Sequence, residues 1–175
     1  MITKSIKNRI MEHFFLYPTE RLRVREIERK AKVPLPSAIK YAKELEKEGI
    51  LKSVEISNVR LYMADRSSKK FLQEKKLHNL RSIYSSGMVE KIIQECSNPA
   101  ISLFGSYSRG EDIETSDIDL YVQTKEKIDA EIFEKTLKRK IQLFCYSDLS
   151  KIDNKELANN IINGIVLNGF LEVIK

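Results

Sequence analysis

Cysteine is scarce in this chain of 175 residues, and long apolar runs are absent. Neither Cys96 nor Cys145 has the spacing of a zinc-binding pair, and both histidines lie far from them in sequence. We therefore expect two free thiols, with no zinc site and no disulfide. No apolar run approaches the ~20 residues of a membrane-spanning helix. Residues 1–15 lack the apolar core and cleavage site of a signal peptide, so we expect a soluble, cytoplasmic protein.

The net charge is confined to the first third of the chain. Residues 1–66 contain 15 Lys and Arg against 9 Asp and Glu, whereas residues 67–175 contain 16 of each. The first third therefore carries the whole formal charge of +6. This asymmetry predicts that the N-terminal part contacts a polyanion and that the remainder has a different task.

The N-terminal third combines three predicted helices with a hairpin. Apolar residues recur at helical spacing, Pro36 suits the first position of the third helix, and Gly49 suits its end. Two segments of strand composition flank Ser57-Asn58, a plausible turn. The helices are predicted over residues 3–17, 24–31 and 37–48. The strands are predicted over residues 50–56 and 59–63.

This order resembles the winged helix-turn-helix domains of bacterial and archaeal transcription regulators, over about residues 3–65. The most typical part is Leu45-Glu46-Lys47-Glu48-Gly49-Ile50-Leu51. The resemblance implies that the third helix enters the major groove of double-stranded DNA and that the hairpin contacts the backbone or the minor groove. The candidate DNA-binding residues are Lys32, Ser37, Lys40, Tyr41, Lys43 and Arg60.

Two alternatives to DNA contact remain open for this surface. Each candidate side chain could simply be solvated. The domain could also bind another protein, because Glu44, Glu46 and Glu48 make the far end of the third helix acidic.

A stiff linker helix is predicted over residues 67–87, because the segment contains neither proline nor glycine before Gly87. Its partial apolar stripe could pack on the second domain or against a second copy of the chain. Winged-helix proteins usually bind two-fold symmetric sites as dimers, so a homodimer is a further hypothesis. The predicted division is a DNA-binding domain at 1–66, the linker, and a second domain at 88–175.

The second domain contains a glycine-serine turn followed by two closely spaced aspartates. An apolar segment, 100–104, precedes Gly105-Ser106, and Asp117 and Asp119 accompany the next apolar run. Alternate residues of a strand share a face, so the two carboxylates should point the same way and repel unless a cation lies between them. Mg²⁺ that also holds substrate phosphates would meet this need. The turn can bring backbone N–H groups close to an anion.

The run GSYSRGEDIETSDIDLYV resembles the signature of the DNA polymerase beta nucleotidyltransferase superfamily, in its minimal nucleotidyltransferase branch. The resemblance implies a small mixed sheet with helices on one side, and transfer of a nucleoside monophosphate from a nucleoside triphosphate to a hydroxyl. It assigns Asp117 and Asp119 to two Mg²⁺ ions. The predicted fold class is thus α+β, with a winged helix-turn-helix, a linker helix and a small α/β domain.

The same resemblance assigns the phosphate-binding residues. Gly105 and Ser106 would hold the β- and γ-phosphates, Arg109 would place a positive charge close to the triphosphate, and Gly110 would allow the turn. For Arg109 the alternative is a salt bridge to a neighbouring acid, Glu111 or Asp112.

The resemblance also implies a third carboxylate on the next strand, which is predicted at 141–146, and this carboxylate is missing. The matching position is Gln142, which is neutral and can neither act as a base nor balance a metal's charge. Asp148, in the loop that follows, is the nearest substitute. Helices are also predicted over residues 88–95, 127–138 and 154–163.

Three functions are compatible with these features. The first is an enzyme, a DNA-tethered nucleotidyltransferase whose acceptor is a protein hydroxyl, a small molecule or an RNA end. The second is a winged-helix regulator whose degenerate second domain senses a nucleotide. The third is an antitoxin-like protein, because free-standing minimal nucleotidyltransferases are commonly paired with small helical partner proteins.

Overall fold

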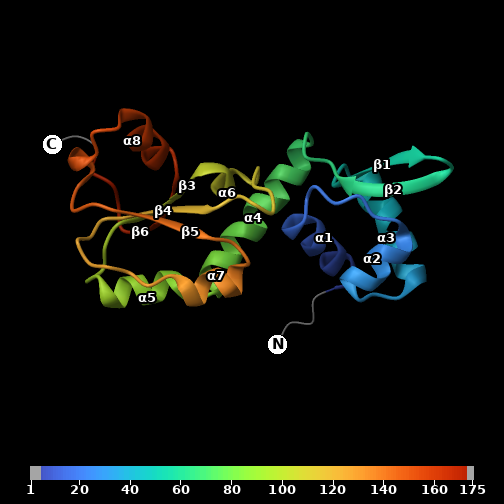
Figure 1. Cartoon of the computed structure of the whole chain (residues 1–175), viewed down its shortest axis with the longest axis horizontal. Helices are drawn as coiled ribbons and strands as arrows, with labels where there is room; N and C mark the ends of the chain where they lie inside the picture. Colours follow the sequence, from blue (N-terminus) through green and yellow to red (C-terminus); the bar gives the residue numbers. More distant parts are fainter. Residues whose placement is uncertain (1–4, 173–175) are drawn as a thin grey trace. The chain divides into compact units, whose positions relative to one another are not determined.

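The chain folds into two compact units, and the computed structural model describes residues 5–172 (Figure 1). Unit 1 extends to His78 and unit 2 begins at Asn79. Helices and strands occur in both units, which confirms the α+β class. No helix in the described part of the chain has the length and apolar character needed to cross a membrane.

Unit 1 has the predicted order of three helices followed by a hairpin. Its elements are α1 (Ile6–Leu16), α2 (Val24–Ala31), α3 (Leu35–Lys47), β1 (Leu51–Ile56) and β2 (Val59–Ala64). The strands pair antiparallel, and Ser57 and Asn58 between them have φ values of 49° and 61°. Positive φ at both central residues is the requirement of a tight type I′ hairpin turn.

The helix α3 begins two residues before the predicted start at 37. Pro36, predicted at the first position of the helix, is its second residue. Proline is tolerated there because the first N–H groups of a helix have no partner within the helix. The inner face of α3 buries Ala38, Ala42 and Leu45 completely against the core of unit 1.

The predicted linker forms α4 (Lys69–Ser85), and the boundary between the units falls inside this helix. Phe71 is part of the core of unit 1, whereas Ile83 is part of the core of unit 2. The two ends of α4 therefore contribute side chains to different cores.

Unit 2 is built on a mixed sheet of four strands. Its elements are α5 (Met88–Glu95), β3 (Ile101–Phe104), α6 (Gly105–Arg109), β4 (Ile118–Val122), α7 (Glu131–Leu137), β5 (Ile141–Cys145), the 3₁₀ turn η1 (Leu149–Lys151), α8 (Lys155–Ile162) and β6 (Ile165–Asn168). The strand order is β5-β4-β3-β6, in which β4 and β5 are parallel and the other pairs antiparallel. The helix α7 begins four residues after the predicted start at 127, where Asp129 accepts a hydrogen bond from the Glu131 N–H.

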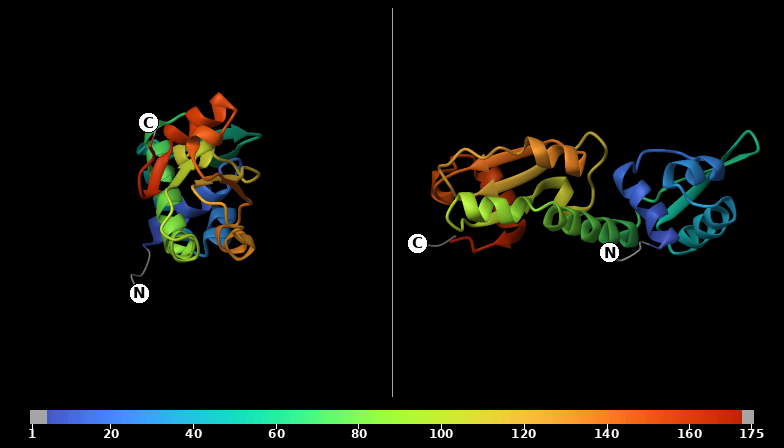
Figure 2. Two further views of the ribbon diagram at one scale, coloured as in Figure 1. Left: turned by 90° about the vertical axis from the view of Figure 1, so that its left-hand side faces the viewer. Right: turned by 90° about the horizontal axis from the view of Figure 1, so that it is seen from below.

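Helices cover both faces of this sheet, which corrects the expectation of helices on one side (Figure 1, Figure 2). Leu103 and Leu120 belong to a core that includes residues of α5 and α7. Tyr121 faces the opposite way and shares a second core with Ile161 of α8. The Ser102 hydroxyl donates a 2.9 Å hydrogen bond to the Ile161 carbonyl, which ties α8 to β3.

Candidate active site

A glycine and a carboxylate lie against each other where β3 ends. In the antiparallel β3–β4 pair, Phe104 lies opposite Asp119, and Gly105 follows with a φ of 72°. A Cβ atom on Gly105 would lie only 2.1 Å from Asp119 Oδ2. The absent side chain therefore allows both the left-handed backbone and the close approach of the carboxylate. The predicted turn is the start of the short helix α6.

The two aspartates differ in burial. Asp117 is exposed just before β4, whereas Asp119 is half-buried within the strand. Burial raises the pKa of the Asp119 carboxyl, the negative charge of Asp117 raises this pKa further, and the Arg109 guanidinium lowers it. The two carboxylates are thus electrostatically coupled.

The Asp117 and Asp119 carboxylates fit a magnesium ion whose other ligands come mostly from phosphate and water. Mg²⁺ in nucleotide enzymes is commonly bound through one or two carboxylates together with substrate phosphates. Asp117 and Asp119 supply two such oxygen donors. Among residues 5–172 no group of three His, Cys, Asp or Glu side chains is placed to hold a metal.

The strand register places Gln142 beside Asp119. In the parallel β4–β5 pair, Asp119 is the register partner of Gln142, so their side chains share a face. Gln142 is exposed. Asp148 lies beyond β5, where its Oδ1 accepts a 2.8 Å hydrogen bond from the Ser150 N–H and caps η1. The neighbour of Asp119 on β5 is therefore the neutral side chain of Gln142 and not Asp148.

Arg109 is held by a neighbouring acid. Its Nε donates a 2.7 Å hydrogen bond to Glu111, and both side chains are about half exposed. The alternative expected from the sequence, a salt bridge to Glu111, is therefore present. Gly110 ends α6 with a φ of 74°, as a left-handed cap requires. Ser106, the second residue of α6, is half-buried.

A buried polar network supports the loop between α6 and β4. Asn79 donates hydrogen bonds of 2.7 Å to Asp112 and 2.9 Å to the Tyr107 carbonyl. Arg139 approaches Asp112 at 3.6 Å, with side-chain exposures of 4% and 1%. Burial and the charge of Asp112 raise the pKa of Tyr107, and the charge of Arg139 opposes them. Sequence reasoning missed this network because its members lie far apart in the chain and no motif links them.

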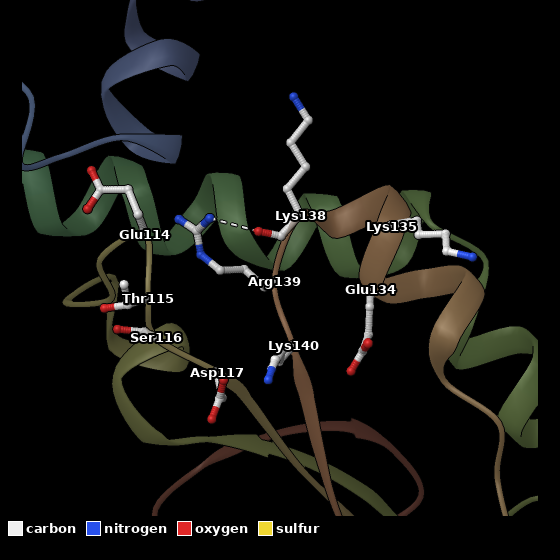
Figure 3. Close-up of a pocket in the computed structure, with 9 residues that line it drawn as sticks. All are labelled: Glu114, Thr115, Ser116, Asp117, Glu134, Lys135, Lys138, Arg139 and Lys140. Atoms are coloured by element: carbon white, nitrogen blue, oxygen red, sulfur yellow. Dashed lines mark hydrogen bonds between the residues drawn. The ribbon is translucent and has the colours of Figure 1, made fainter.

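A pocket of about 620 Å³ opens next to Asp117 (Figure 3). It lies between the loop before β4 on one side and α7 with the α7–β5 connection on the other. Lys138 ends α7 in a left-handed conformation with a φ of 55°, and three residues later the chain enters β5. The lining residues are Glu114, Thr115, Ser116, Asp117, Glu134, Lys135, Lys138, Arg139 and Lys140.

The predicted DNA-binding residues belong to unit 1. Those on α3 are Ser37, Lys40, Tyr41 and Lys43. Lys40 and Lys43 are exposed, whereas Tyr41 packs partly against the core, with the Lys40 ammonium 5.3 Å from its ring centroid. Lys32 is an exposed residue in a left-handed conformation at the end of α2.

Arg60 on β2 is bound within the unit. Its guanidinium donates a 2.7 Å hydrogen bond to Glu46 and a 3.1 Å hydrogen bond to the Ser53 hydroxyl. Lys7 similarly binds Glu44 at 2.7 Å and Glu48 at 2.6 Å. The acidic end of α3 is therefore neutralised by cations of unit 1.

Comparison with known proteins supports the nucleotidyltransferase part of the resemblance. Residues 88–169 match the model of the family described as polymerase beta, nucleotidyltransferase. This range lies within unit 2 and includes the two aspartates and Gln142. No curated protein matches the chain.

The chain is similar to a solved structure of a mutant of ZitR from Lactococcus lactis. The identity is 17% and the TM-score is 0.38, over 50% of this chain. The match spans 60% of the ZitR chain.

Proposed function

We propose that unit 2 is a nucleotidyltransferase that binds a nucleoside triphosphate with Mg²⁺ at Asp117 and Asp119. The observation that carries the proposal is the placement of Asp119 against Gly105 within the segment that matches the family model. Asp117 and Asp119 would hold the metal, and Gly105 and Ser106 would contact the phosphates. Arg109 would turn from Glu111 toward the triphosphate.

The reaction would move a nucleoside monophosphate to a hydroxyl acceptor. The hydroxyl oxygen forms a bond to the α-phosphorus, the bond from that phosphorus to the β-phosphate oxygen breaks, and pyrophosphate leaves. When bound, the metal neutralises phosphate charge. Gln142 cannot accept the hydroxyl proton, so the proton passes to solvent.

A second candidate function follows from Gln142 itself. Because its neutral amide lies beside Asp119, unit 2 could bind the nucleotide without transferring it. The chain would then be a regulator, in which unit 1 binds DNA through the exposed lysines of α3 and unit 2 senses the nucleotide. The net charge of +6 in residues 1–66 favours contact with DNA in either case.

Two measurements on the full chain decide between these functions. The chain is incubated with Mg²⁺ and each of four α-labelled nucleoside triphosphates, and both thermal stability and label transfer are followed. The enzyme is supported if the wild-type chain transfers the label and the double variant Asp117→Asn with Asp119→Asn does not. A thermal shift without label transfer supports the sensor. A matched control, Asp129→Asn with Asp153→Asn, removes the same charge from exposed positions of unit 2. A wild-type chain that shows neither effect would contradict both functions.

A further inference from the structure

Charged residues are absent from two runs that meet at one end of the sheet in unit 2. Residues 157–171 and residues 96–108 are the two longest runs of the chain without Asp, Glu, Lys or Arg, although 32% of all residues are charged. The first run includes β6 and the second includes β3, and these two strands pair antiparallel. The residues that follow β6 therefore lie beside the residues that precede β3.

Specific contacts join the two runs. The Asn168 side chain donates a 2.9 Å hydrogen bond to the Asn98 side chain and a 2.7 Å hydrogen bond to the Pro99 carbonyl. A Cβ atom on Gly169 would lie 3.1 Å from the Cα atom of Ala100. Ala100 precedes β3, whereas Gly105 follows it. This junction is therefore at the end of β3 opposite the candidate active site.

An exposed aromatic ring borders a hollow at this junction. Phe170 is 72% exposed, the highest value among the large apolar side chains of the described residues. The hollow has a volume of about 390 Å³, and Phe170 lines it together with Pro99, Ala100 and Gln123. Among the described residues that line it, only Glu172 is charged. A projecting side chain and a hollow thus occur within one nearly uncharged surface.

The same run leaves further apolar side chains exposed. Ile162 at the end of α8 is 36% exposed, and Val166 on β6 is 42% exposed. The strand β6 forms an edge of the sheet and carries none of the charged side chains that commonly protect such edges. Few charges and exposed aromatic residues are typical of the centre of protein interfaces. We call Ile162, Val166, Phe170 and the adjoining hollow the uncharged surface.

We propose that the uncharged surface binds a second copy of the chain. A two-fold interface places the same surface of both copies against itself, so a charged side chain near the symmetry axis would face its own copy. Ile162, Val166 and Phe170 cause no such repulsion. Because the surface contains both a projecting ring and a hollow, Phe170 of each copy can enter the hollow of the other. A space of roughly 150 Å³ is enough for a benzene ring, and the hollow is larger.

The scarcity of charge favours a second copy over a different protein. Complementary charges select one partner and suppress others, and among the described residues of this surface only Glu172 could contribute to such a selection. The interface would lie at the other end of β3 from Gly105. The inference is therefore independent of the proposed function.

The test measures the molar mass of the full chain by sedimentation equilibrium over a wide range of concentrations. We expect the wild-type chain to approach twice its mass of 20.3 kDa as the concentration rises. In Phe170→Asp a carboxylate would enter the partner's hollow beside Glu172, so the dimer dissociation constant should rise at least about tenfold. The matched control is Ile132→Asp, because Ile132 on α7 is a 63% exposed apolar residue of the same unit. It should dimerise like the wild-type chain.

A second variant changes the hollow and leaves the ring in place. Gln123→Trp adds volume to the lining of the hollow, so the partner's Phe170 can no longer enter and the dimer should weaken by a similar factor. This variant decides the question if circular dichroism shows that Phe170→Asp does not fold.

Three results would overturn the inference. The first is a wild-type chain that stays at 20.3 kDa at every concentration. The second is an equal dissociation constant for Phe170→Asp, Gln123→Trp and Ile132→Asp. The third is a mass that rises beyond the dimer, because a two-fold contact closes on itself. The thermal shift with ATP and Mg²⁺ should be the same in Phe170→Asp and the wild-type chain, and its absence from the wild-type chain would count against the proposed function alone.

Discussion

Asp119 can lie against Gly105 because glycine has no side chain. The carboxylate of Asp119 occupies the space that a Cβ atom on Gly105 would fill. Gly87 provides a comparison, since it has a similar φ of 78° but no atom within 4 Å of its would-be Cβ. Substitution at the two positions therefore separates backbone strain from displacement of the carboxylate.

The first prediction concerns Gly105→Ala, with Gly87→Ala as its control. Both variants should lose about 1–2 kcal/mol of unfolding free energy, because alanine is strained in a left-handed conformation. Only Gly105→Ala should abolish the stabilisation by ATP with Mg²⁺, because its Cβ displaces Asp119. Chemical denaturation and thermal shift measure the two effects. An unchanged nucleotide response in Gly105→Ala would show that the position of Asp119 is not needed.

The second prediction restores a carboxylate at Gln142. In Gln142→Asp the new charge lies beside Asp119, so the half-saturating Mg²⁺ concentration in the presence of ATP should fall by at least about tenfold. Without Mg²⁺ the added repulsion should lower the melting temperature. Gln142→Asn, which is shorter but neutral, should do neither. A metal titration followed by thermal shift measures both effects. Equal behaviour of Gln142→Asp and Gln142→Asn would contradict the prediction.

At the scale of elements, the buried network of Asn79, Asp112 and Arg139 holds three segments together. It connects α4, the loop after α6, and the residue that follows Lys138 at the end of α7. The third prediction is that Asp112→Ala lowers the unfolding free energy by about 3–5 kcal/mol, because Arg139 keeps its buried charge after the Asp112 carboxylate is removed.

A second substitution separates charge from packing in this network. Asp112→Ala combined with Arg139→Met removes both charges, so it should be more stable than Asp112→Ala alone. The exposed Asp153→Ala should stay within about 0.5 kcal/mol of the wild-type chain. Urea denaturation measures all three, and a double variant less stable than the single one would rule out the charge explanation.

The hairpin and α3 are joined through Glu46, and this contact makes the fourth prediction a pH dependence. The Ser53 hydroxyl and then the Arg60 guanidinium lower the pKa of Glu46 from its ordinary value of 4.5. Because the pKa of Glu46 is lower in the folded than in the unfolded state, its contribution to stability is fully present above pH 4.5. This contribution is lost as the pH falls through the folded pKa. The difference in unfolding free energy between wild type and Glu46→Gln should be below about 1 kcal/mol near neutral pH and shrink in acid. Glu55→Gln, an exposed change on the neighbouring strand, serves as the control in the same pH series.

At the scale of the whole molecule, the charge asymmetry gives the fifth prediction. If unit 1 binds double-stranded DNA through α3, changing Lys40 and Lys43 to Ala should reduce the slope of log affinity against log salt by about 2. Lys69→Ala with Lys76→Ala, outside the basic third, should leave the slope unchanged. Fluorescence anisotropy over a range of salt concentrations measures the slope, and equal slopes in the two pairs would remove α3 from the DNA interface.

The order of helices and strands and the glycine–aspartate motif of unit 2 could be predicted from the sequence alone. The predicted bounds of α2 and α5 agree with the structure, and Ser57-Asn58 forms the turn of the hairpin. These features depend on side-chain periodicity and on φ preferences over a few neighbouring residues. The predicted start of α7 was less accurate, because the chain up to Ala130 is not helical and Asp129 there accepts a hydrogen bond from the Glu131 N–H, whereas apolar spacing alone suggested that the helix had already begun.

Only the tertiary structure decided which distant residues meet. The register of β4 against β5 put Gln142 beside Asp119. The packing of α8 on the Tyr121 face covered the second face of the sheet. The buried network and the pocket next to Asp117 likewise join segments that no short-range pattern connects. Sequence by itself determined that two carboxylates, a glycine and one neutral residue would be present. Their distances required the sheet, because hydrogen-bond register and core packing act between residues that are remote along the chain.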